Sequence, residues 1–207
     1  MIDVYNITNF NRTKNELEEF LIFSVAVAGK KAEMTARKVD DFLHSSKCRP
    51  GQELSPFEYL RHLQDIGSLG HRLQSSRLGQ YNRLAEAFSK IARLAEDLKH
   101  ITVETLESVR GIGPKTARFF CLHSRPNYRA AVLDTHILHF LRDLGYKTPK
   151  TTPNGNKYLY WENIFLELCS TLKKSPAELD LSIWSAYAKK EKKELLELIN
   201  LRKNECI

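Results

Sequence analysis

The sequence predicts an all-α protein, and three observations support this. Apolar residues recur every three to four positions along most of the chain, which is the spacing of one helix face. Two Ser-Pro pairs, Ser55-Pro56 and Ser175-Pro176, have the form of helix starts, with serine as the N-cap and proline at the first helical position. No segment of the sequence alternates apolar and polar residues as a half-buried strand does. We therefore expect about nine or ten helices.

The elements can be placed along the chain from this spacing and from the turn residues between them. The first helical stretch is broken at Gly29, where a glycine interrupts the apolar pattern. The segment Tyr146–Tyr158 contains two prolines and Asn154-Gly155, so it is expected to be a loop. The expected helices are Glu16–Leu43 with its break, the helix opened by Ser55-Pro56, Tyr81–His100, Thr102–Val109, Lys115–His123, Thr135–Leu144, Tyr160–Lys173, the helix opened by Ser175-Pro176, and Lys189–Arg202.

Composition and charge favour a polyanionic partner. The 207 residues suffice for one domain or for two apposed helical lobes. Lys and Arg number 32 against 25 Asp and Glu, a formal charge of +7, and such a balance suits nucleic acid because contacts to phosphates release counterions. The longest apolar run, Phe20–Ala28, is shorter than the roughly 18 residues that span a bilayer, and the N-terminus lacks the order of a signal peptide. We expect a cytoplasmic or nuclear protein that is neither secreted nor bound to a membrane.

The cysteines and histidines do not form a metal-binding pattern. Cys48, Cys121, Cys169 and Cys206 lie far apart, without a CxxC pair or a histidine at ligand spacing, so a zinc site or an iron–sulfur cluster is not expected. They are interpreted as reduced thiols. His136 and His139 lie three residues apart, but the sequence offers no third ligand beside them. We expect no metal and no cofactor.

The segment most informative about function is Val109–Ala117, which reads VRGIGPKTA. Two glycines bracket a turn between two short helices, and they permit positive φ and leave no Cβ between the backbone and a bound phosphate. The amides that follow begin a helix, and a helix N-terminus is a phosphate site. Surface charge is an equal alternative for the arginine of this group. The residues expected at the DNA backbone are Gly111, Gly113, Pro114, Thr116 and Arg118.

A second informative segment follows the hairpin, which consists of the two short helices and the glycine turn of Val109–Ala117 between them. The sequence AVLDTHIL places Asp134 after a short apolar stretch and at the start of the next helix. An N-cap aspartate accepts amide hydrogen bonds and faces the positive end of the helix dipole, so it is expected to stay ionised. One helix, a turn through Pro126-Asn127 and a short return leg can bring Lys115 and Asp134 to the same edge of a cleft.

An amine and a carboxylate together suit cleavage of an N-glycosidic bond. The amine of Lys115 attacks the sugar C1′, expels the base and forms a Schiff base that permits β-elimination. The carboxylate of Asp134 stabilises the oxocarbenium-like sugar. The attacking amine must be neutral, and the first turn of a helix disfavours an added positive charge.

These two segments resemble the helix-hairpin-helix–Gly/Pro–Asp (HhH-GPD) DNA glycosylase superfamily, which includes endonuclease III and the 8-oxoguanine glycosylases. The resemblance implies a two-lobed helical fold with a central cleft, Lys115 as the Schiff-base nucleophile and Asp134 as the catalytic aspartate. It also implies a bifunctional glycosylase/AP lyase, since members that only remove the base carry another residue at the lysine position. Arg110 stands where many members have proline, and the missing cluster cysteines argue against the endonuclease III branch.

Weaker resemblance extends over most of the chain. The sequence ELDLSIW, residues 178–184, resembles the C-terminal helix of the short archaeal-type 8-oxoguanine glycosylase/AP lyases, which implies an oxidised purine as the excised base. Residues 19–144 correspond to the helical barrel lobe, with the hairpin at about 102–124, and residues 1–18 plus 145–207 to the terminal lobe. The candidates for the base pocket or the wedge that enters the duplex are Lys30, Lys31, Phe120, Asp180 and Trp184.

Several alternatives stay open at this point. Lys30 and Lys31 also fit a solvated turn, Trp184 fits a core position, and Asp180 fits an inter-helix hydrogen bond. Hairpins of this type also occur in ligases, recombination proteins and nucleases, where they only grip the backbone. The chain could thus be a non-catalytic DNA-binding module, or an enzyme acting on a specialised modified base, as in phage DNA. In each case the expected partner is duplex DNA, bound by a monomer.

Overall fold

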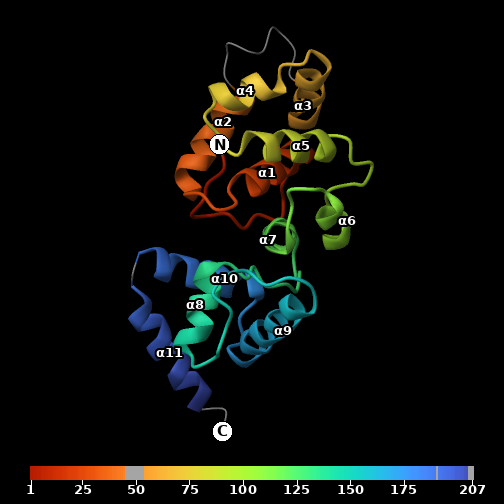
Figure 1. Cartoon of the computed structure of the whole chain (residues 1–207). Coiled ribbons are helices and arrows are strands. Elements are labelled where there is room, and N and C mark those ends of the chain that lie inside the picture. The colour runs from red at the N-terminus through yellow and green to blue at the C-terminus, as the bar shows by residue number, and fades with distance from the viewer. Residues whose placement is uncertain (45–53, 190, 205–207) are drawn as a thin grey trace. The chain divides into compact units, whose positions relative to one another are not determined.

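The computed structural model describes residues 1–44, 54–189 and 191–204, which form eleven helices and no strand (Figure 1). The all-helical class predicted from the sequence is confirmed. The chain divides into two compact units, Met1–Phe120 and Cys121–Ile207. The expected assignment of residues 1–18 and 145–207 to one lobe concerns how these units sit together and stays a prediction. Within the described ranges, no helix has the length and apolar character needed to cross a membrane.

Unit 1 is organised around α5, Tyr81–Ile91, which packs against α1, α3 and α4 (Figure 1). Its core is rich in aromatic rings, and the Phe42 ring lies 5.8 Å from Phe88 and 6.0 Å from Tyr59 between centroids. Burial of such large apolar rings contributes strongly to the free energy that holds the helices together. The other helices of the unit are α1 (Lys14–Ala26), α2 (Ala32–His44), α3 (Pro56–Asp65), α4 (Leu69–Ser75), α6 (Val103–Ser108) and the first part of α7 (Pro114–Ser124).

Most of the predicted helix starts are confirmed. The Ser55 side chain accepts from the Glu58 amide, and the Glu58 carboxylate accepts from the Ser55 amide, which is the reciprocal arrangement of a capping box. Ser175 begins α10 in the same way. The expected break at Gly29 separates α1 from α2, and this glycine has a φ of 72°.

Some predicted boundaries were wrong. The helix expected to reach His100 ends at Ile91, because the Arg61 side chain takes the carbonyl of Ala92 at 2.6 Å. Leu98 is still buried, which explains why the apolar pattern continued past the helix end. The loop expected over Tyr146–Tyr158 is shorter at its C-terminal end, because Asn154 is the N-cap of a helix that begins at Gly155. The helix α4 was not anticipated.

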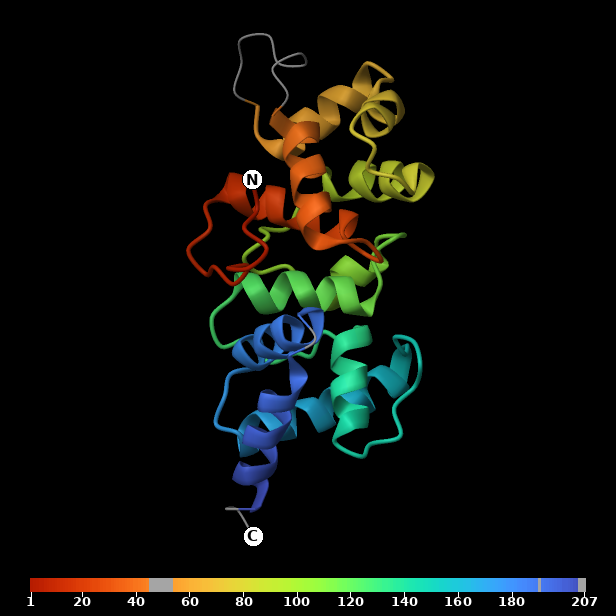
Figure 2. The same ribbon diagram turned by 90° about the vertical axis from the view of Figure 1, so that its left-hand side faces the viewer.

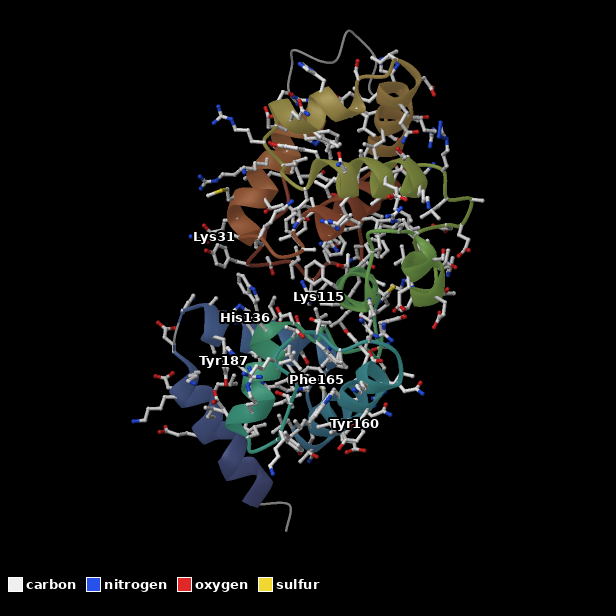
Figure 3. All side chains as sticks on the ribbon, viewed as in Figure 1. Lys31, Lys115, His136, Tyr160, Phe165 and Tyr187 are labelled. Atoms are coloured by element: carbon white, nitrogen blue, oxygen red, sulfur yellow. The ribbon has the colours of Figure 1, made fainter. Side chains whose placement is uncertain are left out.

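Unit 2 is organised around α10, Pro176–Ala188, which packs against α8, α9 and α11 (Figure 2). Phe165 of α9 is fully buried in this core together with Phe140 of α8 (Figure 3). The surrounding helices are α8 (Thr135–Asp143), α9 (Gly155–Thr171) and α11 (Lys192–Asn204), and the last part of α7 also belongs to this unit.

Two of the four cysteines lie in the described part of the chain. Cys121 and Cys169 are buried and in the reduced form, and burial raises the pKa of Cys169 to about 12. A thiol with so high a pKa is a poor nucleophile and a poor metal ligand at neutral pH. Cys48 and Cys206 lie outside the described residues.

Candidate active site

The hairpin joins α6 to α7 through a turn at residues 109–113. The Thr102 side chain caps α6 by accepting from the Thr105 amide at 3.0 Å. Gly111 has a φ of 96°, and a Cβ on it would lie 3.1 Å from Cγ of Arg83. Gly111 is therefore needed both for its conformation and for the close approach of the turn to α5.

Gly113 plays a different part from the one expected. Both hairpin glycines permit a positive φ, but only Gly111 adopts one, so the left-handed conformation is not the reason for a glycine at position 113. It is exposed, and a Cβ built on it meets no atom within 4 Å. Gly113 thus leaves open space directly before the first turn of α7, where the helix dipole favours a phosphate.

Arg83, in the first turn of α5, connects the hairpin to two other turns of unit 1. Its Nη1 donates to the Gly111 carbonyl at 2.7 Å, its Nη2 to the Val25 carbonyl at 2.9 Å, and its Nε to Oε1 of Gln80 at 2.8 Å. A cation is unfavourable at the positive end of a helix, and these three acceptors offset that cost. The turn carrying Gly111 is thereby held to the end of α1 and to the start of α5.

Lys115 lies in the first turn of α7, directly after this turn (Figure 3). The side chain is half-buried, and its Nζ lies 5.5 Å from the centroid of the Phe119 ring. That ring packs on Phe20, with 5.7 Å between centroids. Phe120 is fully buried against the other side of this cluster, 5.6 Å from Phe20, and presents no surface to a base in this structure.

Two other hairpin candidates are buried. Arg118 donates to Oε1 of Glu107 at 2.6 Å and so joins α7 to α6. Thr116 is 5% exposed, and Pro114 is the first residue of α7. In this structure Arg118 holds the two hairpin helices together, while Gly113 and the first turn of α7 are the parts open to a phosphate.

Asp134 is the N-cap of α8, as predicted. Its Oδ1 accepts from the amides of His136 at 2.8 Å and Ile137 at 3.0 Å, and its backbone is extended. Both bonds use the same oxygen, and a carboxylate oxygen is a strong acceptor for amides at a helix N-terminus. The cap holds the orientation of the carboxylate relative to α8.

The remaining candidates for a base pocket differ in exposure. Asp180 is 6% exposed, and its Oδ2 lies 3.1 Å from Nε2 of the fully buried His123, which is the inter-helix hydrogen bond considered from the sequence. Trp184 is half-buried on α10. Lys31 is exposed just before α2, whereas Lys30 is half-buried and donates to the Leu78 carbonyl at 2.7 Å. Burial, with repulsion from neighbouring cations, lowers the pKa of Lys30 to about 8.

Candidate metal-ligand atoms lie in a cluster on unit 1 and on two histidines of α8. Of the described residues, Glu19, Asp40 and His44 bring one ligand atom each within 4.8 Å of one another. The amine of Met1 lies 3.1 Å from Asp40 in this surface cluster. His139 is exposed, and His136 packs edge-on against Tyr187 at 6.5 Å between ring centroids.

The sequence did not single out two residues that hold the backbone of the candidate site. Arg83 binds the hairpin turn, and Tyr158 binds the segment before Asp134. Arg83 looks like any surface arginine in the sequence, and Tyr158 stood at the end of an expected loop. Neither residue carries a local sequence signal for this role, because the backbone groups that they bind lie 25 or more residues away.

An all-helical protein with a glycine-turn hairpin, a lysine at the start of its second helix and a capped aspartate beyond it is a helix-hairpin-helix protein of the HhH-GPD class. The chain belongs to the 8-oxoguanine DNA glycosylase family, because the Ogg-HhH family model matches residues 2–174. The predicted superfamily and its archaeal-type branch are thereby confirmed.

Individual relatives agree with this membership. The 8-oxoguanine DNA glycosylase/AP lyase of Methanocaldococcus jannaschii is 29% identical over 179 residues, which cover 84% of this chain and 81% of the relative. The protein of the same name from Thermoplasma acidophilum is 26% identical over 185 residues, covering 83% and 80%. The crystal structure of the Methanocaldococcus jannaschii 8-oxoguanine DNA glycosylase matches with a TM-score of 0.61 and 23% identity, over 87% of this chain and 82% of that one. The predicted glycosylase fold is confirmed by this match.

Proposed function

We propose that this chain excises 8-oxoguanine from duplex DNA and then nicks the strand, with Lys115 as the nucleophile and Asp134 as the assisting carboxylate. The observation that carries the proposal is the position of Lys115, in the first turn of α7 immediately after the Gly111–Gly113 turn. That position places an amine beside the helix end that attracts a phosphate. The family membership supports the same substrate and reaction, as do the two archaeal relatives, each of which is an 8-oxoguanine DNA glycosylase/AP lyase.

The reaction begins with attack of the neutral Lys115 amine on the sugar C1′. The C1′–N bond to the base breaks, its electron pair leaves with the base, and a proton is taken up by the departing base. The nitrogen bonded to C1′ loses one proton, and its lone pair then displaces O4′ from C1′. O4′ keeps the electron pair of the broken bond and takes up a proton, which leaves an open-chain sugar joined to Lys115 as a protonated Schiff base. Removal of a C2′ proton then expels the 3′ phosphate by β-elimination.

Asp134 acts in the first of these steps. Positive charge develops on the sugar as the bond to the base breaks, and a carboxylate stabilises such charge most when its orientation is fixed in advance. The two amide hydrogen bonds to its Oδ1 provide that orientation. The carboxylate can also relay a proton between the amine and the leaving base.

Binding to the duplex relies on contacts with the phosphate backbone of the DNA. Gly113 and the first turn of α7 receive a phosphate, and lysines of the α1–α2 turn such as Lys31 add positive charge. These contacts carry no base sequence information, so binding is general for duplex DNA and excision is selective. We further propose that the protein binds as a monomer and acts where the genome is, in the cytoplasm or the nucleus.

Borohydride trapping on a duplex containing one 8-oxoguanine tests the proposal. Wild type should give a covalent protein–DNA adduct, and matched duplexes with thymine glycol, uracil or normal guanine should give less. Binding without an adduct on any duplex would identify a non-catalytic module or an enzyme for another modified base. A preference for thymine glycol would place the activity beside that of endonuclease III.

A further inference from the structure

The segment that leads into Asp134 has unusual hydrogen-bond partners for its backbone amides and carbonyls. Residues Ala131–Leu133 are buried and belong to no helix or strand, so they lack the regular partners that buried peptide groups require. The Val132 carbonyl accepts from the Asp134 amide at 2.6 Å. The partners of Ala131 and Leu133 are side chains, which come from α9 and from the loop just before it.

Tyr158 provides two of the partners with one atom. Its hydroxyl accepts from the Leu133 amide at 3.1 Å and donates to the Ala131 carbonyl at 2.7 Å. The side chain is 1% exposed, so water cannot replace it. The hydroxyl thus takes the place that the edge of a neighbouring strand would occupy.

Glu162 and Thr152 complete the set. Oε1 of Glu162, one turn further along α9, accepts from the Ala131 amide at 3.0 Å. Oγ1 of Thr152 donates to the Leu133 carbonyl at 2.8 Å. Glu162 is 8% exposed, and a carboxylate is costly to bury without a specific partner. Three side chains therefore hold both ends of a segment of three residues, directly before Asp134.

We infer that Tyr158 and Glu162 are positioning residues for base excision, which act through the Asp134 carboxylate. An apolar core would bury Ala131–Leu133 equally well but would not set the direction in which the backbone enters α8. Side-chain hydrogen bonds to both ends of the segment do set it, and with it the place of the Asp134 side chain. This inference rests on the proposed role of Asp134 in excision.

Tyr158→Phe is the sharpest variant, because it removes one oxygen and keeps the buried ring. We expect single-turnover excision of 8-oxoguanine at saturating enzyme to slow by roughly tenfold to a hundredfold, since small displacements of a catalytic group have such effects. Affinity for the duplex should stay within about threefold, because the hairpin is untouched. Trapping on a preformed abasic site should also change little, since that step does not break the bond to the base. Tyr187→Phe on α10 is the matched control, because it loses a hydrogen bond to Asp143 in the same unit.

Two further comparisons separate positioning from general damage. Glu162→Gln keeps an oxygen acceptor for the Ala131 amide and should stay within about threefold of wild type, whereas Glu162→Leu should resemble Tyr158→Phe. In an Asp134→Asn background, Tyr158→Phe should cause no further slowing, because residues that act through one group are not additive. Full slowing in that background, or excision by Tyr158→Phe within threefold of wild type, would overturn the inference.

Hydrogen exchange provides a readout that does not depend on activity. The amides of His136 and Ile137, which donate to Asp134, should exchange faster in Tyr158→Phe than in wild type or Tyr187→Phe. Unchanged exchange would also overturn the inference. If wild type excises no base at all but these amides respond as expected, the proposed function fails while the positioning of Asp134 stands.

Discussion

The Arg83 guanidinium donates to the carbonyl of Gly111 across 2.7 Å, and so links the first turn of α5 to the hairpin that carries Lys115. The same guanidinium also holds the end of α1 through Val25. A planar fork can satisfy several acceptors in fixed directions, which a lysine cannot do.

Arg83→Lys should therefore weaken binding to any duplex by roughly tenfold, although the charge is retained. The slope of log affinity against log salt concentration should be unchanged, because Arg83 donates its hydrogen bonds to protein groups and not to phosphates. Titration of a fluorescent duplex at several salt concentrations measures both. Arg61→Lys is the matched control, since Arg61 also donates to a carbonyl of unit 1 but lies away from the hairpin. Full affinity in Arg83→Lys would show that only its charge matters.

Substitution of the two hairpin glycines should affect different properties, DNA affinity at Gly113 and stability at Gly111. Gly113→Val should keep the fold, because a Cβ there meets open space, and should weaken binding to all duplex sequences alike. Gly111→Ala should lower the free energy of unfolding by about 1–2 kcal/mol, because its φ of 96° is unfavourable for alanine. Urea unfolding and duplex titration on both variants check this. Equal affinity of Gly113→Val and wild type would remove Gly113 from the phosphate site.

Lys115→Gln should abolish borohydride trapping and strand nicking while duplex affinity stays within about threefold. The amide cannot form a Schiff base, but it retains the helix start that binds phosphate. Gel analysis of trapped adducts on 8-oxoguanine and abasic duplexes measures the loss. A persistent adduct would assign the chemistry to another amine, such as Lys30.

Asp134→Asn should slow single-turnover excision by about 10²–10³-fold, the usual effect of removing one preorganised electrostatic contact. Thermal stability should be nearly unchanged, because asparagine caps a helix as well as aspartate does. Excision kinetics and a melting curve on the same preparation separate the two effects. An excision rate within threefold of wild type would exclude the catalytic role.

Lys30 should make stability depend on pH above neutrality. The folded pKa is about 8 against an ordinary value of 10.5, so between these values the unfolded chain binds more protons than the folded one. The free energy of unfolding should therefore rise with pH over this interval, as the buried charge is lost. Denaturant unfolding at pH 8 and pH 10 should show a larger increase for wild type than for Lys30→Met. An equal change in the free energy of unfolding of the two proteins between these pH values would contradict a lowered pKa of Lys30.

Much of this protein is determined locally and can be predicted from the sequence. The serine caps of α3 and α10 and the glycine break after α1 depend on neighbouring residues, so local patterns identify them. The same holds for Lys115 at a helix start and Asp134 as an N-cap, because both positions are defined by the few residues around them. Family membership follows from these local motifs as well.

The end of α5 and the partners of the site depended on tertiary structure. The apolar pattern of α5 continues past the helix end to the buried Leu98, and the Arg61 side chain, from α3, binds the carbonyl of Ala92 just after the last helical residue. Arg83 and Tyr158 bind carbonyls that lie 28 and 27 residues away in the chain. A hydrogen bond between distant segments leaves no periodicity in either of them. The sequence alone therefore determined which groups we propose for the chemistry, and folding decided what holds those groups in place.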